Sequence, residues 1–305
     1  VVYSAMHGVG GATVLRAFEA AGFPAPHVVA EQFDPDGSFP TVSFPNPEEP
    51  GAMDLLIELA QRVGAPLALA NDPDADRLAA AIPQPDGSWR RLGGDEIGWL
   101  FADYLLAADD DPDRLVVTTL VSSSLLGKMA ARHGVRSAET FTGFKWIARA
   151  VLEHPELKFV FGYEQALGYL VARQPLDKDG ISAAVLFAEI AAVAAAEGRT
   201  MQDRLDDIAS RFGQHVLADA AVRMTPAEAA STVTALRSDP PGEIGGRAVL
   251  NTEEYPEANL MRFELEGGVR VQIRPSGTEP KVKLYGEAVD EDPAPFVAAL
   301  AELMG

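Results

Sequence analysis

Short apolar runs alternate with amphipathic stretches along the first two thirds of the chain. The apolar run 66–70 has the length of a buried strand, and the preceding stretch Met53–Val63 has the pattern of an amphipathic helix. A second strand-like run at 115–120 is followed by a helical stretch at Leu125–Arg132. This alternation is typical of doubly wound α/β domains. It is interrupted at Asp109-Asp110-Asp111-Pro112, which we interpret as a domain boundary.

From about residue 215 the pattern changes to a series of strand-like runs with helical stretches beside them. The clearest of these runs are 247–251, 259–266, 269–274 and 281–289. Strands grouped in this way with flanking helices predict a small α+β domain. The predicted fold class is therefore α/β, with two doubly wound, three-layer α/β/α domains followed by a smaller α+β domain. The predicted domains are residues 1–108, 109–214 and 215–305.

The composition narrows the kinds of partner that we expect. The 305 residues include 25 basic and 45 acidic side chains, and the formal net charge of −20 disfavours nucleic acid and anionic membranes. The absence of cysteine excludes a disulfide framework and thiol catalysis and favours a cytoplasmic location. No apolar stretch reaches the roughly 18 residues of a transmembrane helix. The chain begins at Val1 as if entered at a strand, so we expect further sequence upstream.

Three carboxylates alternate directly after an apolar run of strand length. Asp72, Asp74 and Asp76 are followed at once by Arg77. They lie in a loop at the carboxyl end of a strand, where open α/β sheets bind their ligands. Oxygen ligands without His or Cys suit Mg²⁺, Mn²⁺ or Ca²⁺, although a solvated acidic loop is the simpler interpretation. An EF-hand is excluded, because its sixth and twelfth positions would be Arg77 and Pro83.

A polar loop joins two alternating runs near the C-terminus. It offers a guanidinium, two hydroxyls, an ammonium and a glycine, from Arg274, Ser276, Gly277, Thr278 and Lys281. A bound phosphate needs such donors: arginine for bidentate pairing, and hydroxyls and backbone N–H groups for its remaining oxygens. In a chain this acidic, a cationic loop of this kind favours a phosphate site over a hairpin whose polar groups face water.

Three further loops carry weaker signals. Glu164 could accept hydrogen bonds from sugar hydroxyls, although a surface glutamate is the simpler interpretation. Gly143 and Lys145 lie in a loop before a helix, where Lys145 suits a phosphate contact or a proton donor as well as a solvated lysine. The glycine-rich stretch 7–11 does not fit the dinucleotide fingerprint, because Thr13 stands in place of its third glycine.

Taken together, these motifs resemble the α-D-phosphohexomutase family, which includes phosphoglucomutases and phosphomannomutases. The resemblance covers essentially the whole chain. Asp72–Arg77 is similar to the family's metal loop, Gly162–Gly168 to its sugar-recognition loop and Arg274–Lys281 to its phosphate-binding loop. Thr142–Lys145 and His7–Gly10 also lie where family members carry such loops.

The resemblance implies a mutase that moves phosphate between C1 and C6 of glucose or mannose, through a phosphoserine and a hexose 1,6-bisphosphate. It implies one Mg²⁺ held by Asp72, Asp74 and Asp76, with Arg77 assisting beside it. It also implies four domains, of which this chain supplies the second, third and fourth. The first domain, which carries the serine, would act in cis, so we expect this chain alone to be inactive.

The resemblance implies roles for the remaining residues. Glu164 would orient the sugar, Gly143 would lie at the substrate, and Lys145 would contact the substrate or transfer a proton. The non-reacting phosphate would be held by Arg274, Ser276, Gly277, Thr278 and Lys281. Ala166 departs from the pattern, because many family members carry a serine at this position.

Other functions stay open at this point. The same chemistry on a pentose or an amino sugar would make the protein a phosphopentomutase or a phosphoglucosamine mutase. A metal-dependent phosphatase would use the aspartates directly. A phosphosugar-binding protein without catalytic activity would need no serine at all.

Overall fold

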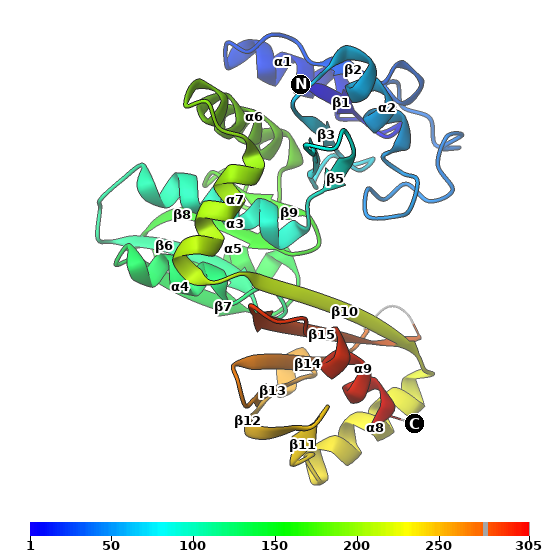
Figure 1. Cartoon of the computed structure of the whole chain (residues 1–305), viewed down its shortest axis with the longest axis vertical. Helices are drawn as coiled ribbons and strands as arrows, with labels where there is room; N and C mark the ends of the chain where they lie inside the picture. The colour runs from blue at the N-terminus through cyan, green and yellow to red at the C-terminus, as the bar shows by residue number, and fades with distance from the viewer. Residues whose placement is uncertain (277–279, 305) are drawn as a thin grey trace. The chain divides into compact units, whose positions relative to one another are not determined.

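Figure 1 shows the computed structural model, which describes residues 1–276 and 280–304. The chain divides into two compact units, Val1–Asp207 and Ile208–Gly305. The first unit contains two sheets and the second contains one. This mixed α/β architecture confirms the predicted fold class, whereas the domain boundaries after residues 108 and 214 stay predictions.

The first sheet has five strands in the order β2-β1-β3-β4-β5. Strand β1 is parallel to β2 and β3, and β4 and β5 continue the sheet antiparallel. The strands are β1 (Val2–Ser4), β2 (His27–Val28), β3 (Ala68–Ala70), β4 (Ala79–Pro83) and β5 (Trp89–Arg91). Every residue of β1 and β3 is buried, as is usual for parallel strands that are covered on both faces.

Helix α2 (Asp54–Val63) packs against β1 and β3. Its buried residues Leu56, Leu59 and Ala60 recur at helical spacing, so one face of the helix meets the sheet. The helix ends at Gly64, which takes the left-handed conformation with a φ of 63°. A glycine is favoured at such a helix end because it has no Cβ to clash.

The second sheet has four strands in the order β7-β6-β8-β9. Strand β6 is parallel to both β7 and β8, and β9 pairs antiparallel with β8. The strands are β6 (Arg114–Thr119), β7 (Arg136–Thr140), β8 (Lys158–Glu164) and β9 (Gly168–Leu170). Helix α4 (Leu125–Arg132) connects β6 to β7.

Helices cover both faces of the second sheet. Helix α5 (Phe144–Glu153) packs on one face, against β6 and β8. On the other face lies α3 (Gly94–Ala107), where the ring centroid of Phe101 is 5.6 Å from that of Phe161 and 5.3 Å from that of Tyr169. Buried aromatic groups of this size contribute strongly to packing, and they place α3 directly behind the strand that ends at Glu164.

Helix α6 (Gly180–Ala196) packs against α1 (Gly11–Ala20) and α3, and it precedes α7 (Met201–Phe212). The Asp179 side chain caps α6, because its Oδ1 accepts a hydrogen bond of 3.0 Å from the N–H of Ile181. Among the described residues, no single helix has the length and apolar composition to cross a membrane. Helices α6 and α7 pass that test only as a pair, with a bend of 88° between them.

The second unit contains an antiparallel six-stranded sheet in the order β10-β15-β14-β13-β12-β11. The strands are β10 (His215–Arg223), β11 (Glu243–Ile244), β12 (Arg247–Tyr255), β13 (Leu260–Leu265), β14 (Val269–Pro275) and β15 (Lys281–Val289). Helices α8 (Pro226–Ser238) and α9 (Ala294–Glu302) pack on this sheet around a core that includes Phe263, Val271 and Leu300.

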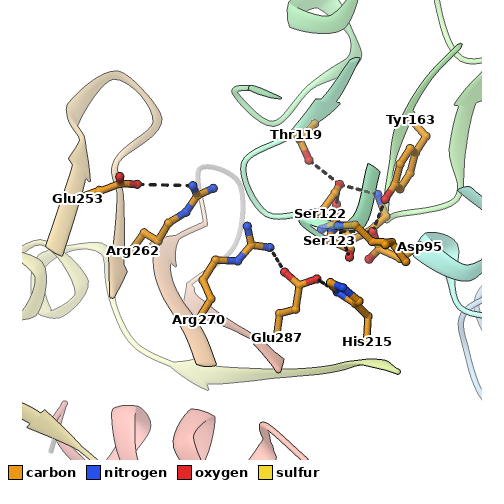
Figure 2. A network of polar contacts seen from close by, with 12 residues as sticks. Asp95, Thr119, Ser122, Ser123, Tyr163, His215, Glu253, Arg262, Arg270 and Glu287 are labelled. Carbon is orange, nitrogen blue, oxygen red and sulfur yellow. Dashed lines mark hydrogen bonds and ion pairs between the residues drawn. The ribbon is translucent and has the colours of Figure 1, made fainter. Parts of the chain in front are cut away.

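Alternation along β14 separates two kinds of residue. Val269, Val271 and Ile273 belong to the apolar core, and the residues between them are polar. Arg270 forms an ion pair of 2.6 Å with Glu287, and the other oxygen of Glu287 lies 2.7 Å from Nδ1 of His215 (Figure 2). All three of these side chains are buried, and buried charges of this kind need such partners.

Candidate functional site

The acidic loop follows β3 and brings its three carboxylates together. One oxygen from each of Asp72, Asp74 and Asp76 lies within 4.8 Å of the others. Asp72 is buried, Asp76 is half-buried and Asp74 is exposed. Three hard oxygen donors at this separation fit a divalent cation such as Mg²⁺, which also keeps several water ligands in most proteins.

A buried asparagine holds the loop in shape. The Tyr3 hydroxyl donates a hydrogen bond of 2.8 Å to Oδ1 of Asn71, and the Asn71 amide donates one of 2.5 Å to the Arg77 carbonyl. The Arg77 N–H in turn donates to Oδ1 of Asp72 at 3.0 Å. The Arg77 guanidinium lies 3.5 Å from Asp72 and 3.9 Å from Asp76. The loop therefore presents its carboxylates beside one fixed cation.

Burial raises the pKa of Asp72 to about 6. The hydrogen bond from the Arg77 N–H opposes this shift, and the negative charges of Asp76 and Asp74 add to it. A carboxylate with a raised pKa is stabilised in its charged form when a cation binds beside it. The position of Asp72 is therefore unfavourable for a bare carboxylate and suitable for a metal ligand.

Glycines on two sides allow the chain to pack against the loop. A Cβ on Gly8 would lie 2.3 Å from Cα of Pro73, and a Cβ on Gly180 would lie 2.1 Å from the Arg77 carbonyl oxygen. The Val9 N–H donates to the Pro73 carbonyl at 2.8 Å, and the Gly180 N–H donates to the Ala75 carbonyl at 3.1 Å. The glycine-rich stretch after β1 thus supports the acidic loop.

Substituting Gly180 by Ala is expected to lower the free energy of unfolding by about 1–3 kcal/mol, because the added methyl group overlaps backbone that cannot retreat. Urea denaturation of the purified chain measures this. The matched control is Gly127→Ala in α4, where the new Cβ meets its nearest neighbour, Oγ of Ser137, at 3.8 Å. That control should be neutral or stabilising by up to about 1 kcal/mol. Equal stability of the two variants would contradict the steric argument.

The predicted sugar-recognition loop adjoins the acidic loop. The Leu78 N–H donates a hydrogen bond of 3.0 Å to the Leu167 carbonyl, and Arg77 forms an isolated β-bridge with Gly168. Oε1 of Glu164 accepts a hydrogen bond of 2.6 Å from the Gly143 N–H. The first unit therefore brings together the three aspartates and Arg77 with the predicted residues Gly143 and Glu164.

A second network fixes the sugar-recognition loop from behind (Figure 2). Oδ1 of the buried Asp95 accepts hydrogen bonds of 2.6 Å from the Tyr163 hydroxyl and 2.7 Å from the Ser123 N–H. Ser122 donates to the Gln165 side chain at 3.1 Å and accepts from the Gln165 N–H at 3.2 Å. The sequence analysis did not single out Asp95, because an aspartate in the first turn of a helix is common for purely local reasons.

Lys178 is the second residue that the sequence analysis did not place in the site. Its ammonium forms an ion pair of 2.5 Å with Oδ2 of Asp76. The turn and helix start expected at 177–180 are present, and they carry the lysine to the acidic loop. The only local signal is Gly180, whose lack of a side chain permits the close approach.

Lys145 does not join this cluster by any contact found among the described residues. It lies exposed in the first turn of α5, with its ammonium 5.5 Å from the ring centroid of Trp146. Its predicted role stays a prediction.

The predicted phosphate-binding loop belongs to the second unit. Arg274 is opposite Lys283 in the β14–β15 pair, and the Ser276 N–H donates to the Lys281 carbonyl at 2.9 Å. The predicted residues Gly277 and Thr278 lie outside the described residues. The structure thus places Arg274, Ser276 and Lys281 at one hairpin end.

An acidic loop at a strand end, linked to a second polar loop within an α/β unit, defines an α/β protein with a candidate divalent-metal site. Family models for three successive domains match nearly the whole chain. They describe the phosphoglucomutase/phosphomannomutase alpha/beta/alpha domain II at residues 1–87, domain III at 93–212 and the C-terminal domain at 216–299. The chain therefore belongs to the phosphoglucomutase/phosphomannomutase family, although no model of the family's first domain matches it.

Curated relatives support the same assignment. The chain is 42% identical over 307 residues to a "Probable phosphomannomutase" of Haemophilus influenzae, covering 99% of this chain and 62% of the relative. It is 33% identical over 345 residues to a phosphopentomutase of Mus musculus, covering 100% of this chain and 55% of the relative. The chain thus spans little more than half the length of these relatives.

Solved structures share the fold. A phosphoglucomutase/phosphomannomutase family protein from Burkholderia thailandensis superposes with a TM-score of 0.76 at 21% identity, covering 99% of this chain and 59% of that one. A mutase annotated by name as a putative phosphomannomutase of Thermus thermophilus gives a TM-score of 0.72 at 21% identity, with coverage of 99% and 59%.

Proposed function

We propose that this chain forms the metal-, sugar- and phosphate-binding part of a phosphosugar mutase that interconverts hexose 1-phosphate and hexose 6-phosphate. The observation that carries this proposal is the backbone link between the three-carboxylate loop and the loop that bears Glu164. The phosphorylated serine would come from an N-terminal domain in cis. A hexose 1,6-bisphosphate would be the intermediate that turns over within the site.

The residues have distinct roles in this proposal. Asp72, Asp74 and Asp76 would hold one Mg²⁺, which supplies neutralising charge for the transferring phosphoryl group. Arg77 adds a fixed positive charge beside them. Glu164 accepts hydrogen bonds from sugar hydroxyls, in a loop held at Gly143.

The non-reacting phosphate falls to the hairpin of the second unit. Its proposed donors are Arg274, Ser276, Gly277, Thr278 and Lys281. Lys145 remains a proposed contact to the substrate or a proton donor. A phosphosugar carries charge at one end and hydroxyls along its ring, so this division of labour matches its chemistry.

The deciding experiment uses the full-length protein with Mg²⁺ and four substrates: the 1-phosphates of glucose, mannose, ribose and glucosamine. We expect a hexose 1-phosphate to be converted to the 6-phosphate faster than the other two classes are converted, without release of inorganic phosphate. Preference for ribose 1-phosphate would instead make the protein a phosphopentomutase. Release of inorganic phosphate, with covalent trapping on Asp72 or Asp74, would replace the mutase by a phosphatase.

The chain without its N-terminal domain offers a second comparison. We expect it to bind phosphosugar and metal without turnover, because it brings no phosphoserine loop. If the gene upstream of Val1 encodes no such loop, a phosphosugar-binding protein without catalytic activity becomes the better proposal.

The raised pKa of Asp72 predicts how metal binding depends on pH. Below a pH of about 6 an incoming cation must displace a proton from Asp72, so affinity should fall as the pH falls, by up to about tenfold per unit. Titration of the purified chain with Mn²⁺ between about pH 8 and pH 5 measures this. In the metal-free chain the sign is opposite for stability: the native state holds this proton more tightly, so lowering the pH through about 6 favours folding.

The control for this pH dependence is Asp72→Asn, which should bind Mn²⁺ more weakly and with less dependence on pH. A native affinity that stays constant down to about pH 5 would contradict the assignment of Asp72 as a metal ligand.

A further inference from the structure

The acidic loop carries its own mobile-side-chain cation in Lys178. The Lys178 ammonium lies 2.5 Å from Oδ2 of Asp76, and both side chains are about three-quarters buried, with 23% and 27% exposed. Lys178 enters from the segment before α6, on the opposite side of the loop from the glycines that follow β1 in sequence. The contact therefore joins two distant segments and is not a local turn.

The charges around the loop are closely balanced. Three carboxylates face two cationic side chains, Arg77 and Lys178. The Arg77 guanidinium stays 3.5 Å or more from the carboxylates, and its main-chain groups are fixed by hydrogen bonds. Lys178 makes the closer contact, through a flexible side chain that can swing away. Of the two cations, Lys178 is thus the one able to give way.

A divalent cation and the Lys178 ammonium would compete for the same carboxylate. A cation bound by one oxygen from each aspartate approaches Asp76, whose Oδ2 already contacts the ammonium. Two positive groups that share one carboxylate repel each other at this distance. Binding of the ion is therefore expected to weaken or break the contact between Lys178 and Asp76.

We propose that Lys178 is an exchangeable counter-cation of the metal loop: its ammonium neutralises Asp76 while no divalent ion is bound, and it withdraws from Asp76 when the ion binds. This inference rests on the proposed metal site. Lys178 acts here as a positioning residue, because it holds the empty loop in its binding geometry and lowers the affinity for the ion.

The stem of Lys178 gives this exchange a consequence for the sugar-recognition loop. A Cβ on Gly168 would lie 3.0 Å from Cδ of Lys178 and 3.3 Å from the ring of Phe144. The lysine stem thus passes over the end of the sugar-recognition loop on its way to Asp76. An ammonium that leaves Asp76 stays tethered at this loop, so metal loading changes the charge presented beside it.

The test is a titration of the purified chain with Mn²⁺, followed by the loss of the free-ion resonance signal. Lys178→Met should bind Mn²⁺ about three- to tenfold more tightly than the native chain, because a competing ion pair of modest strength is removed. Lys178→Arg, which keeps the charge, should stay within about twofold of the native affinity. The matched control is Lys158→Met, which breaks another lysine–aspartate ion pair, with Asp109, and should leave the affinity unchanged.

A measurement on the native chain avoids any effect of substitution on folding. Brief acetylation, read by mass spectrometry, should modify Lys178 several-fold faster with saturating Mg²⁺ than without it, while Lys158 serves as the internal reference. Unchanged labelling of Lys178 in the presence of bound metal, or unchanged or weaker Mn²⁺ affinity in Lys178→Met, would overturn the exchange. A native chain that binds no Mn²⁺, or binds it equally well as Asp74→Ala, would instead overturn the metal site itself.

Discussion

Replacing Asp74 by alanine should lower the Mg²⁺-dependent kcat of the full-length protein by at least about a thousandfold. The physical reason is the loss of one of three carboxylates that would hold the ion, whose charge stabilisation is worth several kcal/mol in phosphoryl transfer. Asp74 is the exposed member of the group, so its truncation should leave stability almost unchanged. Asp72 would be a poorer choice, because it also holds the Arg77 N–H.

The measurement is the initial rate over a range of Mg²⁺ concentrations. Asp110→Ala is the matched control, because it removes an exposed aspartate from the acidic stretch between α3 and β6. It should behave like the native protein. Undiminished Mg²⁺-dependent turnover in Asp74→Ala would remove the metal role of this loop, whatever the behaviour of the control.

The acidic loop could be predicted from the sequence because its information is local. An apolar run ends, three carboxylates alternate, and an arginine follows, all within a few residues. The structure places this loop directly after β3, with the three carboxylate groups together. Spacing along the chain was sufficient here, because the ligand atoms belong to a single turn.

Lys178 and Asp95 could not be predicted in the same way. The partners of these residues are Asp76 and Tyr163, which lie far away in the sequence. Each looked like an ordinary charge at a turn or at a helix start. What makes them part of the site is tertiary packing, with glycines allowing segments to approach.

The same limit applies to the shortest strands. Strand β7 reads Arg-Ser-Ala-Glu-Thr and has no apolar pattern, and it becomes a strand by parallel pairing with β6. The predicted strand 27–33 extends only to Val28, and a 3₁₀ turn follows at Ala30–Gln32. There the Ser4 hydroxyl donates a hydrogen bond of 2.6 Å to the Gln32 side chain, a tertiary contact that the apolar pattern does not encode.

The largest effect expected outside the metal loop concerns the sugar. Substituting Glu164 by glutamine in the full-length protein should lower kcat/KM for hexose 1-phosphate by about ten- to a hundredfold. Hydrogen bonds to a charged acceptor contribute roughly 1.5–3 kcal/mol, and an amide replaces that acceptor with a weaker one. Glutamine keeps the shape of the side chain, and its carbonyl oxygen can still accept the hydrogen bond from the Gly143 N–H.

Two further variants separate recognition from structure. Glu19→Gln changes an exposed glutamate on α1 and should leave kcat/KM unchanged. Glu164→Ala also removes the partner of the Gly143 N–H, so it should lose about 1–3 kcal/mol of unfolding free energy in addition to activity. If Glu164→Gln keeps kcat/KM within about twofold of the native value while Glu164→Ala loses it, Glu164 only anchors the loop. In that case the sugar must be recognised by other groups.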